Sequence, residues 1–201
     1  MRPNRQLRRV TTLIATTLIV AGLSGCTPTA NAPMVTPDAA LWTVGDSLAT
    51  GTGFAMYDPR PFVWGVGASG FTTRSITTIL GNTLAKISAT GFTPKTVVVT
   101  GGVNDFAVNA SVAEIEAGMV EFEAAMNARG AEVVFVKEPA WSREAQFAPI
   151  YSWIETRRHW IDCLAVKGPH MYGDGDHPLS YLDFGACVSK TLATLPGLRL
   201  T

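Results

Sequence analysis

The chain has 201 residues, enough for one domain with a sizeable core, and 47% of them are hydrophobic. Its 16 basic and 16 acidic residues cancel, and four of the arginines fall within the first ten residues, so the remainder is net acidic. Because binding to a phosphate backbone requires clustered cations, this balance argues against nucleic acid as a partner.

The beginning of the chain has the order of an export signal. A basic start leads into an apolar run over residues 10–23, shorter than the about 20 residues that a membrane span requires. The run ends in the letters LSGC, which resemble a bacterial lipobox and place the cysteine to be acylated at Cys26. We therefore expect residues 1–25 to be a lipoprotein signal peptide. Cleavage of a plain secretory signal nearby is the alternative.

Residues 26–39 contain many Pro, Thr, Ala and Asn residues and show neither a helical nor a strand period. We interpret them as the lipidated cysteine followed by a flexible tether, with a folded domain over residues 40–201. The expected location is the cell envelope, with the protein anchored to the outer face of the cytoplasmic membrane, or secreted.

The other two cysteines are Cys163 and Cys187. An isolated pair in an exported protein favours a disulfide, and a loop of this length contributes about 3.5 kcal/mol in the chain-entropy description. Metal binding would require more cysteines or a tighter spacing.

The rest of the chain alternates between strand and helix patterns. We predict strands over 39–44, 62–66, 96–100, 131–136 and 160–164, and helices over 71–89, 111–129, 148–158 and 181–195. For residues 160–164, a continuation of the preceding helix is the alternative. The second of these helices is the clearest, because Ser111 and Glu114 have the spacing of a capping box and Gly130 follows its end. Such alternation predicts an α/β fold in three layers, with a parallel sheet of about five strands between helices.

A serine follows the first predicted strand in the turn Gly45-Asp46-Ser47. This turn would place the Ser47 hydroxyl at the carboxyl end of the strand, where open α/β sheets bind their ligands. Asp46 is expected to shape the turn by hydrogen bonding rather than to act as an acid.

A glycine-rich stretch, Gly65 to Gly70, matches the dinucleotide pattern G-x-G-x-x-G. That fingerprint also requires an acidic residue about 20 positions later to bind a ribose hydroxyl. No Asp or Glu occurs between Asp58 and Asp105, so we reject a nicotinamide site and expect no cofactor.

Two further polar segments stand out. One follows the strand predicted over 96–100, and the other precedes the last predicted helix. Asn104, in the stretch Gly-Val-Asn-Asp, can turn its amide donors into a cleft, although asparagines also commonly cap turns. Asp174 and His177 are three residues apart, so the carboxylate can hold one imidazole nitrogen while the other takes a proton. A plain polar loop is the alternative.

Together these segments resemble the SGNH (GDSL-type) hydrolases, in the family's order, from about Leu41 to Leu195. Four separated blocks match, at residues 45–48, 67–70, 102–105 and 174–177. The resemblance implies a flavodoxin-like fold and a serine esterase or lipase. It assigns the catalytic roles to Ser47, Asp174 and His177, and the oxyanion hole to Ser47, Gly70 and Asn104.

Several alternatives stay open at this point. Asp176 adjoins the histidine and can replace Asp174 in orienting it, and His170 with Asp174, Asp176 and His177 can in principle hold a metal, although we expect none. The expected substrate is a small-molecule or glycan acyl ester, and the protein is expected to be a monomer that meets the membrane through its lipid. Acyl transfer to an alcohol, and a binding lipoprotein without turnover, are the alternative functions.

Overall fold

The computed structural model describes residues 35–138, 143–166, 177–178 and 180–201. The predicted signal peptide, Cys26, His170, Asp174 and Asp176 lie outside the described residues.

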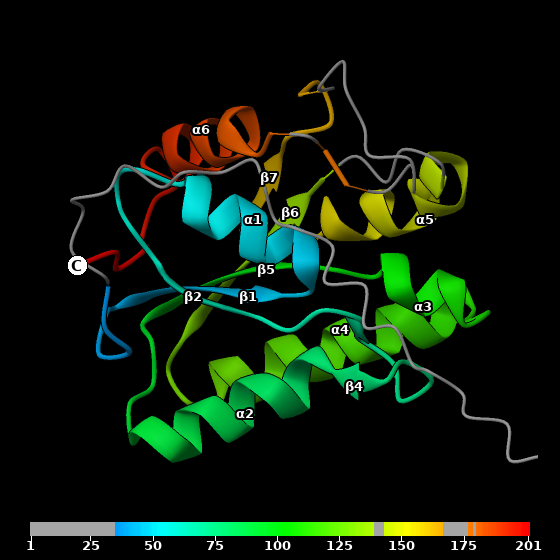
Figure 1. The fold of residues 1–201 in the computed structure, drawn as a ribbon, viewed down its shortest axis with the longest axis horizontal. Coiled ribbons are helices and arrows are strands. Elements are labelled where there is room, and N and C mark those ends of the chain that lie inside the picture. Colours follow the sequence, from blue (N-terminus) through cyan, green and yellow to red (C-terminus); the bar gives the residue numbers. More distant parts are fainter. Residues whose placement is uncertain (1–34, 139–142, 167–176, 179) are drawn as a thin grey trace, which may run out of the picture.

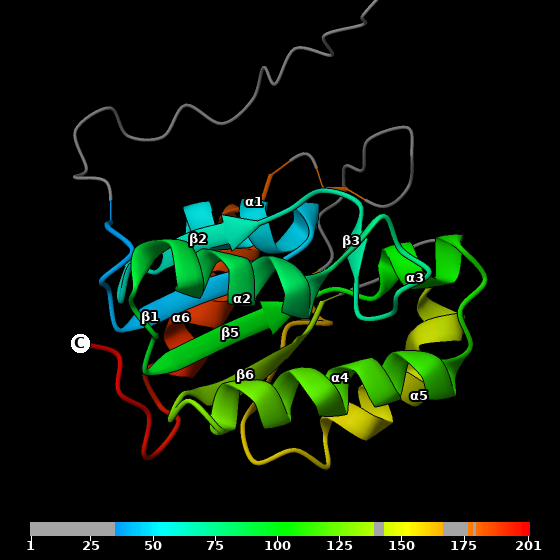
Figure 2. The ribbon, with the colours of Figure 1, turned by 90° about the horizontal axis from the view of Figure 1, so that it is seen from below.

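A five-stranded parallel sheet forms the middle of the protein (Figures 1 and 2). Its strands lie in the order β2-β1-β5-β6-β7, which gives the flavodoxin-like succession of a doubly wound sheet. Their bounds are β1 Leu41–Gly45, β2 Phe62–Gly65, β5 Thr96–Thr100, β6 Glu132–Lys137 and β7 Trp160–Asp162. All five predicted strands are confirmed, and so is the predicted α/β fold in three layers.

Helices cover both faces of this sheet. Helices α1 (Ser47–Ala55) and α6 (Leu182–Leu192) lie on one face, and α2 (Ile79–Thr90) and α4 (Val112–Asn127) lie on the other (Figure 1). Helix α5 (Glu144–Ile154) packs its apolar side chains into the same core cluster as α4. Burial of β-branched residues such as Val97 and Val98 on both faces of β5 explains why its sequence is apolar at its centre.

Both ends of α4 lie near the residues that the sequence indicated. Ser111 caps α4 and forms the predicted capping box with Glu114. The pKa of Glu114 is lowered to about 2, because the Ser111 amide and hydroxyl and the Arg74 guanidinium all donate to its carboxylate. Helix α4 ends at Asn127, and Gly130, in the turn between α4 and β6, adopts a φ of +78°, which favours glycine.

Two helix predictions were inaccurate by four or more residues at an end, and two helices were not predicted. The helix expected over 71–89 begins only at Ile79, because the preceding residues form the short strands β3 (Ser69–Gly70) and β4 (Thr77–Thr78). Helices α1 and α3 (Val103–Ala107) were not predicted, since both begin inside turns rich in glycine. Helix α5 begins four residues before the predicted start and contains Pro149.

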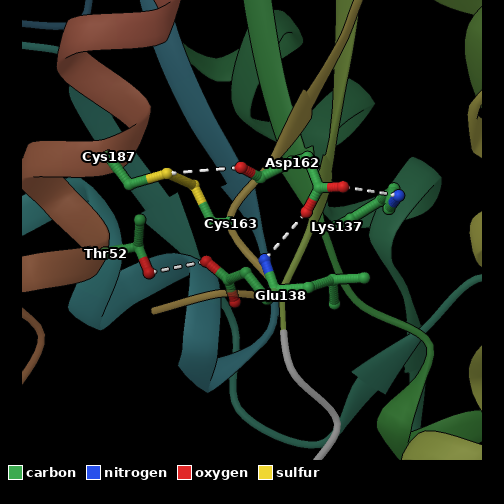
Figure 3. Close-up of a disulfide and its surroundings, with 7 residues drawn as sticks. Thr52, Lys137, Glu138, Asp162, Cys163 and Cys187 are labelled. Atoms are coloured by element: carbon green, nitrogen blue, oxygen red, sulfur yellow. Dashed lines mark hydrogen bonds and ion pairs between the residues drawn. A yellow bond between two sulfur atoms is a disulfide. The ribbon is translucent and has the colours of Figure 1, made fainter. Parts of the chain in front are cut away.

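The predicted disulfide is confirmed. Cys163, which follows β7, is bonded to Cys187 on α6, and the two residues are 24 positions apart in the sequence (Figure 3). The bond fastens α6 to the last strand of the sheet. Within the described ranges, none of the helices is both long enough and apolar enough to cross a bilayer.

Candidate active site

Ser47 and His177 meet at the carboxyl end of the sheet. Ser47 is the first residue of α1, directly after β1, and its Oγ lies 2.7 Å from Nε2 of His177. The two residues are 130 positions apart in the sequence, and both are partly exposed. A hydroxyl hydrogen-bonded to an imidazole nitrogen is the arrangement in which histidine can remove the serine proton. The catalytic roles of these residues stay predictions.

Asp46 shapes the turn that presents Ser47, as expected. Its side chain caps α1 by accepting the Leu48 amide hydrogen at 2.9 Å, and the residue is 1% exposed. Burial raises the pKa of Asp46 to about 6, while amide hydrogen bonds and the nearby His177 favour the charged form. Gly45 adopts a φ of +145°, and a Cβ at this position would lie 2.0 Å from the carbonyl oxygen of Thr100. The turn before Ser47 therefore requires a glycine.

Asn104 connects the segment over residues 67–70 to the turn that presents Ser47. Its Nδ2 donates to the Ser69 carbonyl oxygen at 2.9 Å and lies 3.3 Å from Asp46 Oδ2. The Ser69 hydroxyl in turn donates to the Gly45 carbonyl oxygen at 3.1 Å. Two acceptors on the nitrogen side fix the orientation of the amide. The structure thus brings Ser47, Gly70, Asn104 and His177 to one end of the sheet, as the sequence blocks predicted.

Asp105 organises the segment that carries Gly70, a role that the sequence reasoning missed. Its carboxylate is fully buried and accepts hydrogen bonds from the Phe71 and Thr72 amides and from the Thr72 and Ser75 hydroxyls. A Cβ on Gly70 would lie 2.3 Å from Ser75 Oγ and 2.5 Å from the Asp105 carboxylate. The close approach of this buried carboxylate therefore excludes any side chain at Gly70. The adjacent letters Asn-Asp were the only signal in the sequence.

The dinucleotide pattern at Gly65 to Gly70 does not form a phosphate site of the Rossmann kind. In that motif the last glycine opens a helix whose N-terminus binds the pyrophosphate. Here Gly70 belongs to a short strand, and α2 begins only at Ile79. Among the described residues, no group of three or more His, Cys, Asp or Glu side chains is arranged to hold a metal ion. Three of the four residues weighed for a metal lie outside that part of the chain.

A cavity of about 360 Å³ lies beside the start of β6, at the end of the sheet opposite to Ser47. His159 lines it and is 4% exposed, with Nε2 at 3.6 Å from Glu132 Oε2. Burial lowers the pKa of His159 and so favours the neutral ring. No serine, threonine or cysteine is among the described residues that line this cavity, so it offers no hydroxyl or thiol nucleophile.

A scan of the chain against protein-family models gives no match. A search among curated proteins likewise finds no significantly similar sequence.

Proposed function

We propose that the protein is an SGNH-type serine esterase that hydrolyses acyl esters outside the cytoplasm. The observation that carries the proposal is the 2.7 Å contact between Ser47 Oγ and His177 Nε2 at the carboxyl end of a parallel sheet. A serine hydroxyl is too weakly acidic to attack an ester unaided, so it requires a base in contact with it.

In the proposed reaction, His177 removes the Ser47 proton while Oγ attacks the ester carbonyl carbon. His177 then protonates the leaving alcohol. In the second half of the reaction, His177 removes a proton from water, the water oxygen attacks the acyl carbon, and His177 returns the proton to Ser47 Oγ as the acid leaves. Asp174, which the family resemblance assigns as the residue that orients His177, lies outside the described residues. Its role rests on the D-x-x-H spacing alone.

The tetrahedral intermediate carries a negative oxygen that requires donors already aimed at it. We assign these donors to the Ser47 and Gly70 amides and to Asn104 Nδ2. One Asn104 amide hydrogen is engaged by the Ser69 carbonyl oxygen at 2.9 Å, whereas the contact with Asp46 is longer, at 3.3 Å. The hydrogen on the Asp46 side is therefore the one that we expect to turn toward the oxyanion.

The substrate and location stay proposals from the sequence. Acyl esters of glycans or lipids suit a protein anchored through Cys26 on the outside of a membrane. Metabolic labelling with a fatty-acid analogue tests the anchor, since Cys26→Ser should lose the label and release the protein.

The function is tested by Ser47→Ala and a panel of p-nitrophenyl esters of increasing acyl length. The wild type should hydrolyse at least one ester, and Ser47→Ala should reduce turnover to the uncatalysed rate because it removes the nucleophile. A fluorophosphonate should label the wild type at Ser47, where Oγ displaces fluoride from phosphorus, and should leave the variant unlabelled.

The control is Ser152→Ala, which removes an exposed hydroxyl on α5 that donates only to its own helix, at Ala148. This variant should retain full activity. Labelling at a serine other than Ser47 would contradict the assignment. Binding of acylated glycans without hydrolysis of any ester would favour the non-catalytic lipoprotein, and ester formation with an added alcohol would favour the acyltransferase.

A further inference from the structure

Glu138 is a buried acid next to the candidate active site that the proposed mechanism does not use. It follows β6 directly and is 8% exposed. Its Oε1 accepts a hydrogen bond from the Thr52 hydroxyl on α1 at 2.7 Å, and the two side chains point toward each other in Figure 3. The Tyr151 hydroxyl on α5 donates to its carbonyl oxygen at 2.7 Å. Glu138 therefore joins the end of β6 to helices on both faces of the sheet.

A small cavity of about 20 Å³ lies beside Glu138 and is also lined by Leu48, Thr100 and Gly101. Thr100 is 3% exposed, and among the described residues its Oγ1 has no hydrogen-bond partner. A cavity of this volume holds one water molecule when polar groups line it. The Thr100 hydroxyl and the Glu138 carboxyl group are two such polar groups, and Leu48 places the cavity next to Ser47.

The charges around Glu138 favour its neutral form. None of the ion pairs in the described part of the chain involves Glu138. Burial raises the pKa of Glu138 to about 8; the hydrogen bond from Thr52 opposes the shift, and the negative charge of Asp46 adds to it.

The other titratable groups nearby do not compensate a negative charge on Glu138. The Tyr151 hydroxyl donates to the backbone carbonyl oxygen of Glu138. Lys137, the preceding residue, donates instead to Glu155 and Asp162 through Nζ. His177 and Asp105 act electrostatically on Asp46.

We propose that the neutral carboxyl group of Glu138 is a positioning group for Ser47, which it holds by fixing α1 against the end of β6 through Thr52 and through one water beside Thr100. Thr52 lies five residues after Ser47 on the same helix, about 7.5 Å along its axis. One oxygen of a neutral carboxyl group accepts the hydrogen bond from Thr52. The O–H of the same group can donate a hydrogen bond to a water molecule in the cavity. The inference rests on the proposed function, because it concerns the geometry of the same serine.

Loss of the Glu138 proton should disturb this arrangement. The carboxylate would no longer donate a hydrogen bond to the water in the cavity. Its negative charge would also lie near that of Asp46, which caps the same helix. Both effects act on the first turn of α1, and a misplacement of a reacting group by about 1 Å can cost about 10²-fold in rate.

The experiment compares pH profiles of kcat and KM for the wild type and Glu138→Gln, from well below to well above pH 8. The wild type should lose kcat on the alkaline side with little change in KM. Glu138→Gln keeps a neutral acceptor and a donor, so it should retain kcat within about twofold on the acid side and lack the alkaline decline. Glu138→Leu, which has neither polar group, should lower kcat toward the about 10²-fold loss at every pH.

A second pair of variants separates positioning from a general loss of packing. Thr52→Val removes the hydroxyl that binds Oε1 and should lower kcat about tenfold without changing KM. Thr83→Val is the matched control, since Thr83 is equally buried but its hydroxyl donates within α2, to the Ile79 carbonyl oxygen. This control should leave kcat unchanged. Equal kcat values for the two threonine variants would overturn the proposal.

Infrared difference spectra across the same pH range test the protonation without any substrate. A band of a protonated carboxyl group should persist at neutral pH in the wild type and be missing in Glu138→Gln. The proposal fails if that band is missing from the wild type, or if the Gln variant keeps the alkaline decline while the wild type hydrolyses esters. A wild type that hydrolyses no ester fails the proposed function itself, and the infrared band then reports on the state of Glu138 alone.

Discussion

The two ends of the sheet each contain a buried or half-buried histidine and a cavity, yet their surroundings differ. At the carboxyl end, His177 contacts Ser47, and a cavity of about 20 Å³ nearby is lined by Leu48, Thr100 and Glu138. At the amino end, His159 lines a cavity of about 360 Å³, and Glu132, one of the two acidic residues that line it, is paired with Arg158. Cavity volume is therefore a poor guide to the candidate active site, because the proposed reaction requires a nucleophile and a base in contact.

The largest expected effect comes from replacing each of the two histidines by alanine, with the His159 variant as the control for the His177 variant. His177→Ala should lower kcat/KM by about 10²–10⁴-fold, the usual contribution of a general base. His159→Ala should change kcat/KM by less than about twofold while leaving a cavity at the amino end. Steady-state kinetics on a p-nitrophenyl ester measures both. Comparable losses in the two variants would remove the distinction between the two ends.

The next effect in size concerns Asn104. Asn104→Ala removes a proposed oxyanion donor and the bond to the Ser69 carbonyl oxygen, so kcat should fall by about 10²–10³-fold. KM should change little, because the oxyanion forms only after binding. Asn127→Ala is the control, since Asn127 lines the cavity at the amino end. A change in KM alone for Asn104→Ala would place this residue in substrate binding instead.

Asp105→Asn should act on stability more than on chemistry. The amide that replaces one carboxylate oxygen would face hydrogen-bond donors from Phe71, Thr72 and Ser75 that need an acceptor. Hydrogen bonds to charged groups contribute about 1.5–3 kcal/mol each, so the free energy of unfolding should fall by at least about 1.5 kcal/mol. Urea unfolding measures the change. Asp183→Asn, in the exposed first turn of α6, should cost less than about 1 kcal/mol.

A pH-dependent loss of stability, similar in size to the effect of Asp105→Asn, is expected between about pH 6.5 and pH 8. The pKa of Glu138 is about 8 in the folded protein and 4.5 in its ordinary state, so in this window the folded protein binds more protons than the unfolded chain. The free energy of unfolding must then fall as pH rises, by about 2 kcal/mol over the window. Asp46, with a pKa of about 6, contributes mainly below it. Thermal unfolding at several pH values should show the decline in the wild type and a smaller one in Glu138→Gln.

Much of this architecture was predictable from local sequence. The five strands are short apolar runs bounded by turns, and Thr96–Thr100 is β-branched throughout because it is covered on both faces. The capping box at Ser111 and the disulfide between Cys163 and Cys187 followed from spacing and from the predicted export. The order of the polar blocks along the chain was enough to predict that Ser47, Asn104 and His177 would gather at one end of the sheet.

The tertiary structure decided what depends on contacts between distant segments. The start of α2 at Ile79 was not readable because Asp105, 26 residues later, holds the amides of Phe71 and Thr72 in a non-helical loop. Glu138 follows a strand without any motif, and only the tertiary structure buries it and brings it into contact with Thr52 on α1. A local pattern records the preferences of neighbouring residues, whereas the protonation of a buried acid is set by the burial and charges that the whole fold brings around it.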